Sequence, residues 1–120
     1  MNNINILLID DEKEFIETLG ERLELRQYSS KIAENGETGI NMVKEESFDI
    51  VILDLMMPGL NGLDTLKQIK AIDKNLPVIL LTGHGSTKDG AKGMDMGAFD
   101  FLMKPLDIND LIKKIKLALK

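Results

Sequence analysis

The chain has 120 residues, of which 43% are hydrophobic and 29% are charged, and its formal net charge is −5. This length suits one domain with its own hydrophobic core, so we expect residues 1–120 to form a single domain. The negative charge gives no electrostatic reason for binding to nucleic acid or to an anionic membrane. The chain has no cysteine and one histidine, which excludes disulfides and metal sites built from thiolates or histidines. Because it lacks a signal-peptide pattern and an apolar run of membrane-spanning length, the sequence predicts a cytoplasmic protein.

Short apolar runs and amphipathic segments alternate along the chain. An uninterrupted apolar run such as Ile4–Ile9 is typical of a buried strand. Apolar residues that recur every four positions in a charged background, such as Phe15, Leu19 and Leu23, indicate one face of a helix. The strands that we expect are 4–9, 28–33, 50–54, 78–81 and 99–103. The helices that we expect lie around 15–23, from 36 to about 46, around 63–69, at 86–96 and at 108–118.

This alternation predicts an α/β fold, in which one five-stranded parallel sheet is covered by helices on both faces. The first, third and fourth runs are apolar throughout, so they should be interior strands. The second run carries Ser29, Ser30 and Lys31, and the fifth is also partly polar, so both should be edge strands. The result is the flavodoxin-like order 2-1-3-4-5, in which ligands bind at the switch point between strands 1 and 3.

Carboxylates end the first and third strands at this switch point. Asp10 and Asp11 follow the first strand, and Asp54 ends the third shortly before the Met-Pro-Gly segment 57–59, which cannot continue a strand. Because adjacent strands lie about 4.8 Å apart, the three carboxylates would repel one another unless a cation neutralises them. A hydrated, all-oxygen site suits Mg²⁺. The alternative is that three solvated aspartates line the rim of the sheet without a metal.

Two further polar residues should emerge at the same end of the sheet. Thr82 follows the fourth strand and Lys104 follows the fifth. A hydroxyl group and an ammonium that face metal-binding carboxylates suit the recognition of an incoming phosphoryl group.

Together these residues resemble the receiver domains of bacterial response regulators, the CheY-like family, over essentially the whole chain. The motifs that carry the resemblance are Asp10-Asp11 followed by Glu12, Asp54 with Pro58 and Gly59 behind it, Thr82 followed by the small Gly83, Phe101, and Lys104-Pro105. The segments 81–85 and 97–102 are most similar to receivers of transcriptional activators in the nitrogen-regulator (NtrC-like) class.

The resemblance implies a phosphoacceptor domain of two-component signalling rather than a classical enzyme. Asp54 would accept a phosphoryl group from the phosphohistidine of a sensor histidine kinase or phosphotransfer protein. The domain would itself catalyse this transfer and its own dephosphorylation. Asp11, Asp54 and the backbone carbonyl of Met56 would bind Mg²⁺ directly, with Mn²⁺ as a substitute, and Asp10 would act through a bound water.

The resemblance also implies how the phosphorylated site is read. Thr82 and Lys104 would each contact a phosphoryl oxygen, the ring of Phe101 would follow the movement of Thr82, and the bond between Lys104 and Pro105 would be cis. Met56 and His84 would flank the route of the attacking water. The fourth helix, fifth strand and fifth helix would form the output face toward a downstream effector. The domain would be a monomer or a phosphorylation-dependent dimer, and would bind neither nucleic acid nor a membrane.

Three other functions compete with this interpretation. A small haloacid-dehalogenase-type phosphatase also forms an aspartyl phosphate, but it needs an acid two residues past the nucleophile, where Met56 stands. A flavodoxin-like cofactor carrier needs a hydroxyl- and glycine-rich loop after the first strand, where Asp10-Asp11-Glu12 would repel a phosphate. An unphosphorylated pseudo-receiver would act only through its surface, and the complete set of motif residues argues against it.

The fourth helix is the weakest in the sequence. Interior Gly90 and Gly93 each cost about 1 kcal/mol relative to alanine, and Ala91 and Met94 are the obvious candidates for its buried face. We therefore expect a marginal helix, which replacement of both glycines by alanine should stabilise. Met94, Met96 and Met103 are interpreted as core residues.

Overall fold

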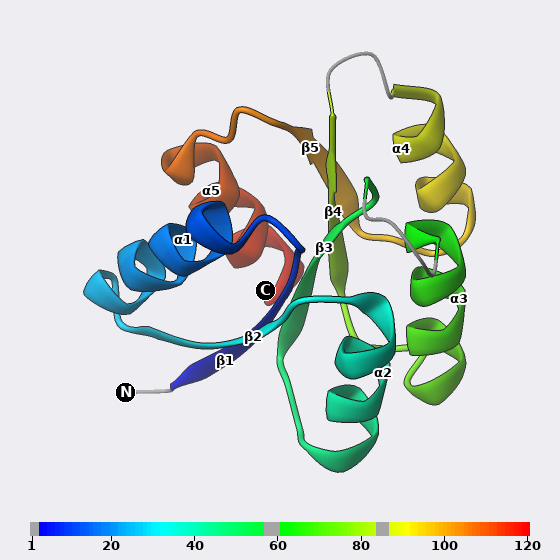
Figure 1. Ribbon diagram of the computed structural model, residues 1–120, viewed down its shortest axis with the longest axis horizontal. Coiled ribbons are helices and arrows are strands. Elements are labelled where there is room, and N and C mark those ends of the chain that lie inside the picture. Colours follow the sequence, from blue (N-terminus) through cyan, green and yellow to red (C-terminus); the bar gives the residue numbers. More distant parts are fainter. Residues whose placement is uncertain (1–2, 57–60, 84–86) are drawn as a thin grey trace.

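The computed structural model describes residues 3–56, 61–83 and 87–120, with the side chain of Thr87 left aside. Strands and helices alternate strictly within these residues (Figure 1). The strands are β1 (Ile4–Ile9), β2 (Tyr28–Ala33), β3 (Ile50–Asp54), β4 (Val78–Thr82) and β5 (Asp100–Met103). The helices are α1 (Lys13–Leu25), α2 (Gly36–Glu45), α3 (Gly62–Ile72), α4 (Thr87–Asp95) and α5 (Ile108–Ala118). The predicted elements are therefore confirmed, although β4 includes Thr82 and β5 begins at Asp100.

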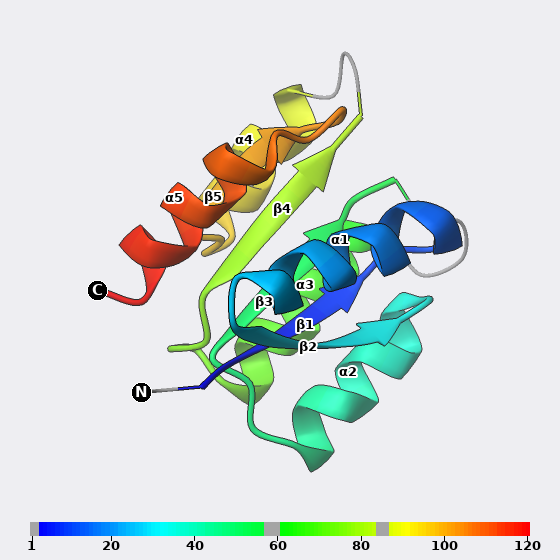
Figure 2. The ribbon, with the colours of Figure 1, turned by 90° about the vertical axis from the view of Figure 1, so that its left-hand side faces the viewer.

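All strand pairs in the sheet are parallel, and the strand order is β2-β1-β3-β4-β5, as predicted. Helices α1 and α5 cover one face of the sheet, and α2, α3 and α4 cover the other (Figures 1 and 2). The register places Ile9 beside Leu53 and Asp54 beside Leu81, so β1, β3 and β4 end close together. This common edge is the carboxyl end of the sheet.

The sheet is buried on both faces, which explains the uninterrupted apolar runs. One cluster joins Leu7, Ile9 and Leu53 to residues of α2 and α3. The other joins Ile6, Leu8 and Ile52 to residues of α1 and α5. Neighbouring residues along each central strand therefore serve opposite cores, because side chains alternate between the two faces of a strand. These rigid strands fix the positions of the residues that follow them.

Helix α4 packs against the sheet through its glycines, which corrects the expectation from helix propensity. Gly90 and Gly93 are buried, whereas Ala91 is exposed and Met94 is 38% exposed. A Cβ on Gly90 would lie 2.6 Å from Cδ2 of Phe101, and a Cβ on Gly93 would lie 2.1 Å from Cδ1 of Leu80. Both distances are far shorter than a normal carbon–carbon contact of about 3.5–4.0 Å. A side chain at either position would therefore force its neighbour on the sheet to shift, so we expect alanine there to destabilise the protein, contrary to the expectation from helix propensity.

The methionines also differ in part from the prediction. Met96 packs against the core cluster of α2 and α3, as expected. Met94 and Met103 are 38% and 39% exposed, so the core interpretation is wrong for both. Within the described ranges, no helix is both long and apolar enough to cross a membrane.

Candidate functional site

The carboxyl ends of β1 and β3 bring two buried aspartates together. Asp10 directly follows β1 and is 0% exposed, and Asp54 is the last residue of β3 and is 1% exposed. Within the part of the chain that the structure describes, carboxylate oxygens of Asp10, Glu12 and Asp54 lie within 4.8 Å of one another. The predicted convergence is thus confirmed for Asp10 and Asp54. Glu12 joins the cluster, whereas Asp11 is exposed and lies outside it.

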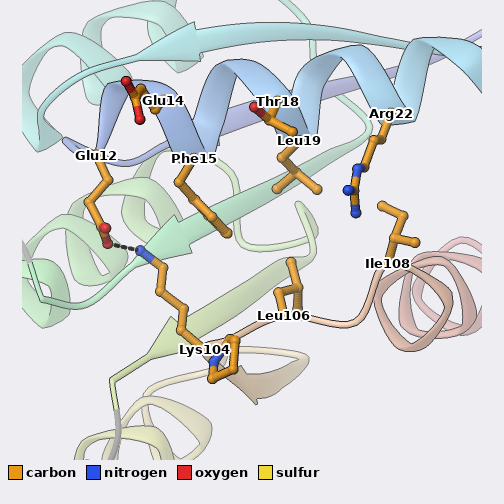
Figure 3. A pocket seen from close by; sticks show the side chains of 10 residues that line it. Glu12, Glu14, Phe15, Thr18, Leu19, Arg22, Lys104, Leu106 and Ile108 are labelled. Atoms are coloured by element: carbon orange, nitrogen blue, oxygen red, sulfur yellow. Dashed lines mark hydrogen bonds and ion pairs between the residues drawn. The ribbon is translucent and has the colours of Figure 1, made fainter.

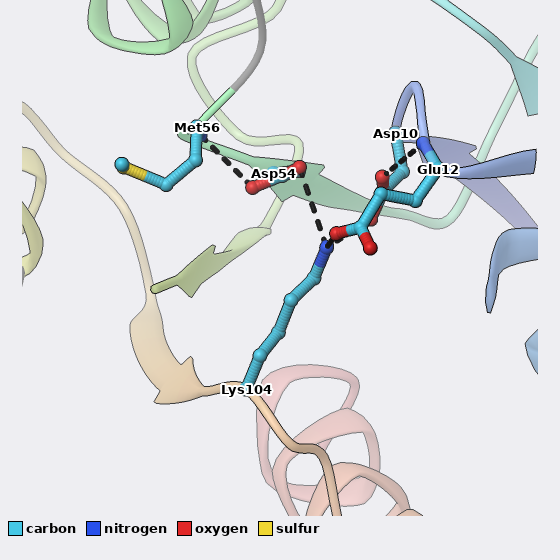
Figure 4. Close-up of polar contacts among 5 residues, drawn as sticks. All are labelled: Asp10, Glu12, Asp54, Met56 and Lys104. Atoms are coloured by element: carbon cyan, nitrogen blue, oxygen red, sulfur yellow. Dashed lines mark hydrogen bonds and ion pairs between the residues drawn. The ribbon is translucent and has the colours of Figure 1, made fainter. Parts of the chain in front are cut away.

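Each buried aspartate is held by a backbone amide two residues further along the chain. The N–H of Glu12 donates to Oδ1 of Asp10 at 2.8 Å, and the N–H of Met56 donates to Oδ1 of Asp54 at 2.9 Å. Such local bonds are typical of aspartates where the chain turns. They use one oxygen of each carboxylate and direct the other, Oδ2, toward the shared site (Figure 4). The site therefore has two fixed oxygen acceptors.

Lys104 reaches this pair from the end of β5. Its backbone N–H donates to the carbonyl of Thr82 at 2.8 Å, which ties it to the end of β4. Its Nζ lies 2.8 Å from Oδ2 of Asp10, 2.5 Å from Oε1 of Glu12 and 3.4 Å from Oδ2 of Asp54. The following peptide bond to Pro105 is cis, as predicted. The ammonium of Lys104 thus forms ion pairs with three carboxylates.

The ionisation of these groups reflects burial and mutual contact. Burial raises the pKa of Asp10 to about 6, although Lys104 and the amide of Glu12 oppose the shift and the charge of Asp54 adds to it. Burial lowers the pKa of Lys104, but its contacts with Asp10, Glu12 and Asp54 outweigh this effect and leave the pKa above its usual value. Lys104 therefore stays protonated, and the carboxylates still outnumber the cation.

Thr82 adds an unused hydroxyl to the same edge. It is the last residue of β4 and is 0% exposed, and its Oγ1 has no hydrogen-bond partner among the described residues. An unsatisfied buried hydroxyl costs free energy, so a ligand that binds it would recover that cost. Gly83 follows and is half-buried. His84 lies outside the described residues.

Phe101 lies on the edge strand β5, which β4 separates from β3, and beside α4. It is half-buried, and its ring atoms occupy the space into which a side chain at Gly90 would extend. Phe101, the predicted switch residue, therefore lies against α4, the helix that follows Thr82 in the chain. Its movement with Thr82 stays a prediction.

The donor set fits a hard divalent cation. Asp10 and Asp54 present carboxylate oxygens at a buried edge, and Mg²⁺ prefers oxygen ligands with several retained waters. Three carboxylates share the single positive charge of Lys104. The remaining negative charge favours the binding of a metal cation in addition to this ammonium. Met56 is 55% exposed, and its N–H donates to Oδ1 of Asp54. The roles of its carbonyl and of Asp11 as ligands stay predictions.

A parallel 2-1-3-4-5 sheet whose carboxyl edge joins acids to a buried threonine and a lysine defines a receiver fold. The sequence matches the family described as "Response regulator receiver domain" over residues 6–116. The chain therefore belongs to this family and is a receiver of two-component signal transduction.

Curated relatives are transcriptional regulators. The chain is 38% identical over 120 residues to the uncharacterized transcriptional regulatory protein YkoG of Bacillus subtilis, covering 100% of this chain and 53% of the relative. It is 38% identical over 115 residues to the transcriptional regulatory protein CpxR of Escherichia coli K12, covering 96% of this chain and 49% of the relative. The chain thus spans about half the length of these relatives.

Solved structures agree with the fold. A response regulator receiver domain protein from Clostridium thermocellum superposes with a TM-score of 0.92 at 36% identity, covering 97% of this chain and 94% of that one. NtrX from Brucella abortus, in a complex with ADP, gives a TM-score of 0.93 at 28% identity, covering 98% of this chain and 27% of that one. The nitrogen-regulator subclass stays a prediction, since CpxR and YkoG match at higher identity.

Proposed function

We propose that Asp54 is the phosphoacceptor of this receiver. A carboxylate oxygen of Asp54 attacks the phosphorus of a phosphohistidine on a partner kinase or phosphotransfer protein. The phosphorus–nitrogen bond breaks as the new phosphorus–oxygen bond forms, and the electron pair leaves with the imidazole. The observation that carries this proposal is the position of Asp54 at the carboxyl end of the central strand, beside Asp10 and within 3.4 Å of the ammonium of Lys104.

The surrounding residues supply position and charge rather than covalent chemistry. Phosphoryl transfer depends mainly on alignment and on stabilisation of charge on the equatorial oxygens. The Met56 amide fixes Oδ1 of Asp54, which orients the carboxylate. Lys104 and the unpaired hydroxyl of Thr82 each bind a phosphoryl oxygen at the same strand edge.

A bound Mg²⁺ would neutralise negative charge on the acids and the phosphoryl oxygens. Asp11, Asp54 and the carbonyl of Met56 would hold it, with Asp10 acting through a water, and Mn²⁺ would substitute. Binding to the native state alone raises the melting temperature. We therefore expect added MgCl₂ to stabilise the wild type and Asp11→Ala to remove this response. An Asp11→Ala variant with the full response would contradict direct ligation by Asp11.

The output of the domain is proposed to pass through the α4–β5–α5 surface. Thr82 precedes α4, and Phe101 on β5 lies against Gly90 of that helix, so a movement of either residue reaches this surface. An effector domain, beyond residues 1–120 or on another protein, would read the change. A sensor histidine kinase in the cytoplasm is the proposed phosphodonor, and the receiver acts as a monomer or a phosphorylation-dependent dimer without binding nucleic acid or membrane itself.

The test is mass spectrometry after incubation with acetyl phosphate and MgCl₂. We expect one phosphate adduct on Asp54 that disappears with EDTA and in Asp54→Asn. The matched control is Asp64→Asn, which changes an exposed aspartate on α3 and should keep the full adduct. An undiminished adduct in Asp54→Asn would sink the assignment. Absence of any adduct in the wild type would favour the pseudo-receiver, and continuous turnover of phosphate esters would favour the phosphatase.

A further inference from the structure

The ammonium of Lys104 lies nearer to the start of α1 than to Asp54. Its Nζ is 2.5 Å from Glu12 and 2.8 Å from Asp10, but 3.4 Å from Asp54. It also lies 4.4 Å from the centroid of the Phe15 ring, within the range of a cation–π interaction. Figure 3 shows Glu12 and Phe15 both directed toward Lys104 from the first residues of this helix. Two of its partners therefore come from the N-cap and the first turn of α1 and lie outside the buried aspartate pair.

The geometry of Glu12 explains why its carboxylate is available for this contact. Glu12 is the N-cap residue of α1, yet its side chain forms no capping hydrogen bond. Its backbone N–H instead donates to Oδ1 of Asp10, which fixes the position of its Cα beside the site. The carboxylate then extends to Lys104, and the Glu12 side chain as a whole is 63% exposed.

A divalent cation competes with Lys104 for the same oxygens. Nζ of Lys104 already contacts Oδ2 of Asp10 and Oδ2 of Asp54, which are the two buried acids of the cluster. A cation that Asp54 binds directly and Asp10 binds through a water therefore weakens the contacts of the ammonium with these two oxygens. Glu12 and Phe15 offer the ammonium two partners that the cation does not need, so Lys104 need not move into solvent or leave the site.

We propose that Glu12 is a positioning residue that holds Lys104 beside the site while a divalent cation is bound there, directly by Asp54 and through a water by Asp10. Glu12 thereby keeps the lysine within reach of the acceptor and lowers the cost of cation binding. The inference rests on the proposed function, because it assigns Mg²⁺ and Lys104 to the same reaction. It assigns no metal-ligand role to Glu12 itself.

The first test measures Mg²⁺ affinity from amide chemical shifts during a MgCl₂ titration. The variants are Glu12→Gln and the matched control Glu14→Gln, each in the wild-type and in the Lys104→Met background. Glu14 is an exposed acid in the first turn of α1 and forms no ion pair with Lys104 in the described structure. The control therefore measures the general effect of removing one negative charge near the site.

The expected result is that Glu12→Gln weakens Mg²⁺ binding about 1.4- to fivefold more than Glu14→Gln, the range of an exposed ion pair of about 0.2–1 kcal/mol. This excess should vanish in the Lys104→Met background, because the contact that Glu12 makes is then absent. Equal effects of the two glutamine variants would overturn the proposal. An excess that persists without Lys104 would also overturn it, in favour of direct metal ligation by Glu12.

A second readout follows Lys104 itself without any phosphorylation. In the metal-free wild type, the ring current of Phe15 should shift the ε-methylene protons of Lys104 upfield. The shift should persist when Mg²⁺ is added and should diminish in Glu12→Gln but not in Glu14→Gln. Loss of the shift on Mg²⁺ addition to the wild type, or its retention in Glu12→Gln, would refute positioning by Glu12. Neither test uses the phosphate adduct, so a failure of the Asp54 assignment would be seen separately by mass spectrometry.

Discussion

Replacement of Gly93 by alanine is expected to destabilise the protein, although alanine is the better helix former. The new Cβ would lie 2.1 Å from Cδ1 of Leu80, whose side chain is fully buried in the sheet. Either α4 or the leucine must move by more than about 1 Å to restore a normal contact of about 3.5 Å. Overpacking of this kind costs about 1–3 kcal/mol, whereas the gain in helix propensity is about 1 kcal/mol.

The net expectation is a loss of up to about 2 kcal/mol in the free energy of unfolding. For a domain of this size it corresponds to a melting temperature lower by about 5–10 °C. Urea unfolding and thermal unfolding, both followed by circular dichroism, measure the two quantities. Ala91→Gly is the matched control, because position 91 is exposed on the same helix and reports the propensity cost alone, about 1 kcal/mol.

A double-mutant cycle separates the contact from other effects. Leu80→Ala alone should cost about 2–5 kcal/mol, as for other buried leucines. Combined with Gly93→Ala it should cost less than the sum of the two, because the new methyl group fills part of the vacated space. If Gly93→Ala instead stabilises the protein by the amount that Ala91→Gly removes, the close packing of α4 on β4 is not what selects glycine.

Three further predictions concern the acceptor site and the helix caps. Burial raises the pKa of Asp10 from 3.8 to about 6, so the metal-free folded state binds the extra proton; its unfolding free energy should fall by about 2 kcal/mol as the pH rises from about 4 to 6. Asp10→Asn should flatten this profile in urea titrations with EDTA, and an unchanged slope would contradict the assignment. Asn35 caps α2, because its Oδ1 accepts a hydrogen bond from the N–H of Thr38 at 2.8 Å. Asn35→Ala should therefore lower the free energy of unfolding by about 1 kcal/mol in chemical denaturation. An unchanged free energy of unfolding would mean that water replaces the cap. Met56→Asn and His84→Asn should each change the rate of autodephosphorylation in Mg²⁺, and identical phosphate lifetimes in both variants and the wild type would show that these positions do not control access of water.

The topology was predictable because the polarity of each strand indicates whether it lies at an edge or in the interior of the sheet. Polar residues in β2 and a short, partly polar β5 left β1, β3 and β4 for the interior, and the flavodoxin-like order 2-1-3-4-5 meets this requirement. The convergence of Asp10 and Asp54 then followed from the parallel register. Both inferences depend on periodicity and on strand ends, which are local properties of the chain.

The features that the sequence analysis missed depend on distances between remote segments. Helix propensity alone marks Gly90 and Gly93 as destabilising residues. The structure shows that their lack of a side chain lets α4 pack closely against Phe101 and Leu80. The contact of Glu12 with Lys104 joins residues 92 positions apart and depends on how α1 begins relative to β5. Glu12 directly follows the acidic pair and so was noticed in the sequence. The sequence alone does not show that its side chain points toward Lys104.

The long separation between the carboxylates and Lys104 bears on how the domain folds. Asp10 and Asp54 are brought together by the pairing of β1 with β3, whereas their ammonium partner arrives only with β5, near the end of the chain. A partly folded chain that contains β2, β1 and β3 but not β5 would hold two neighbouring carboxylates with no counter-charge. Repulsion raises the free energy of such an intermediate relative to the complete sheet. The acidic site thus disfavours half-formed receivers and makes folding more cooperative, at some cost in rate because the compensating contact closes a long loop.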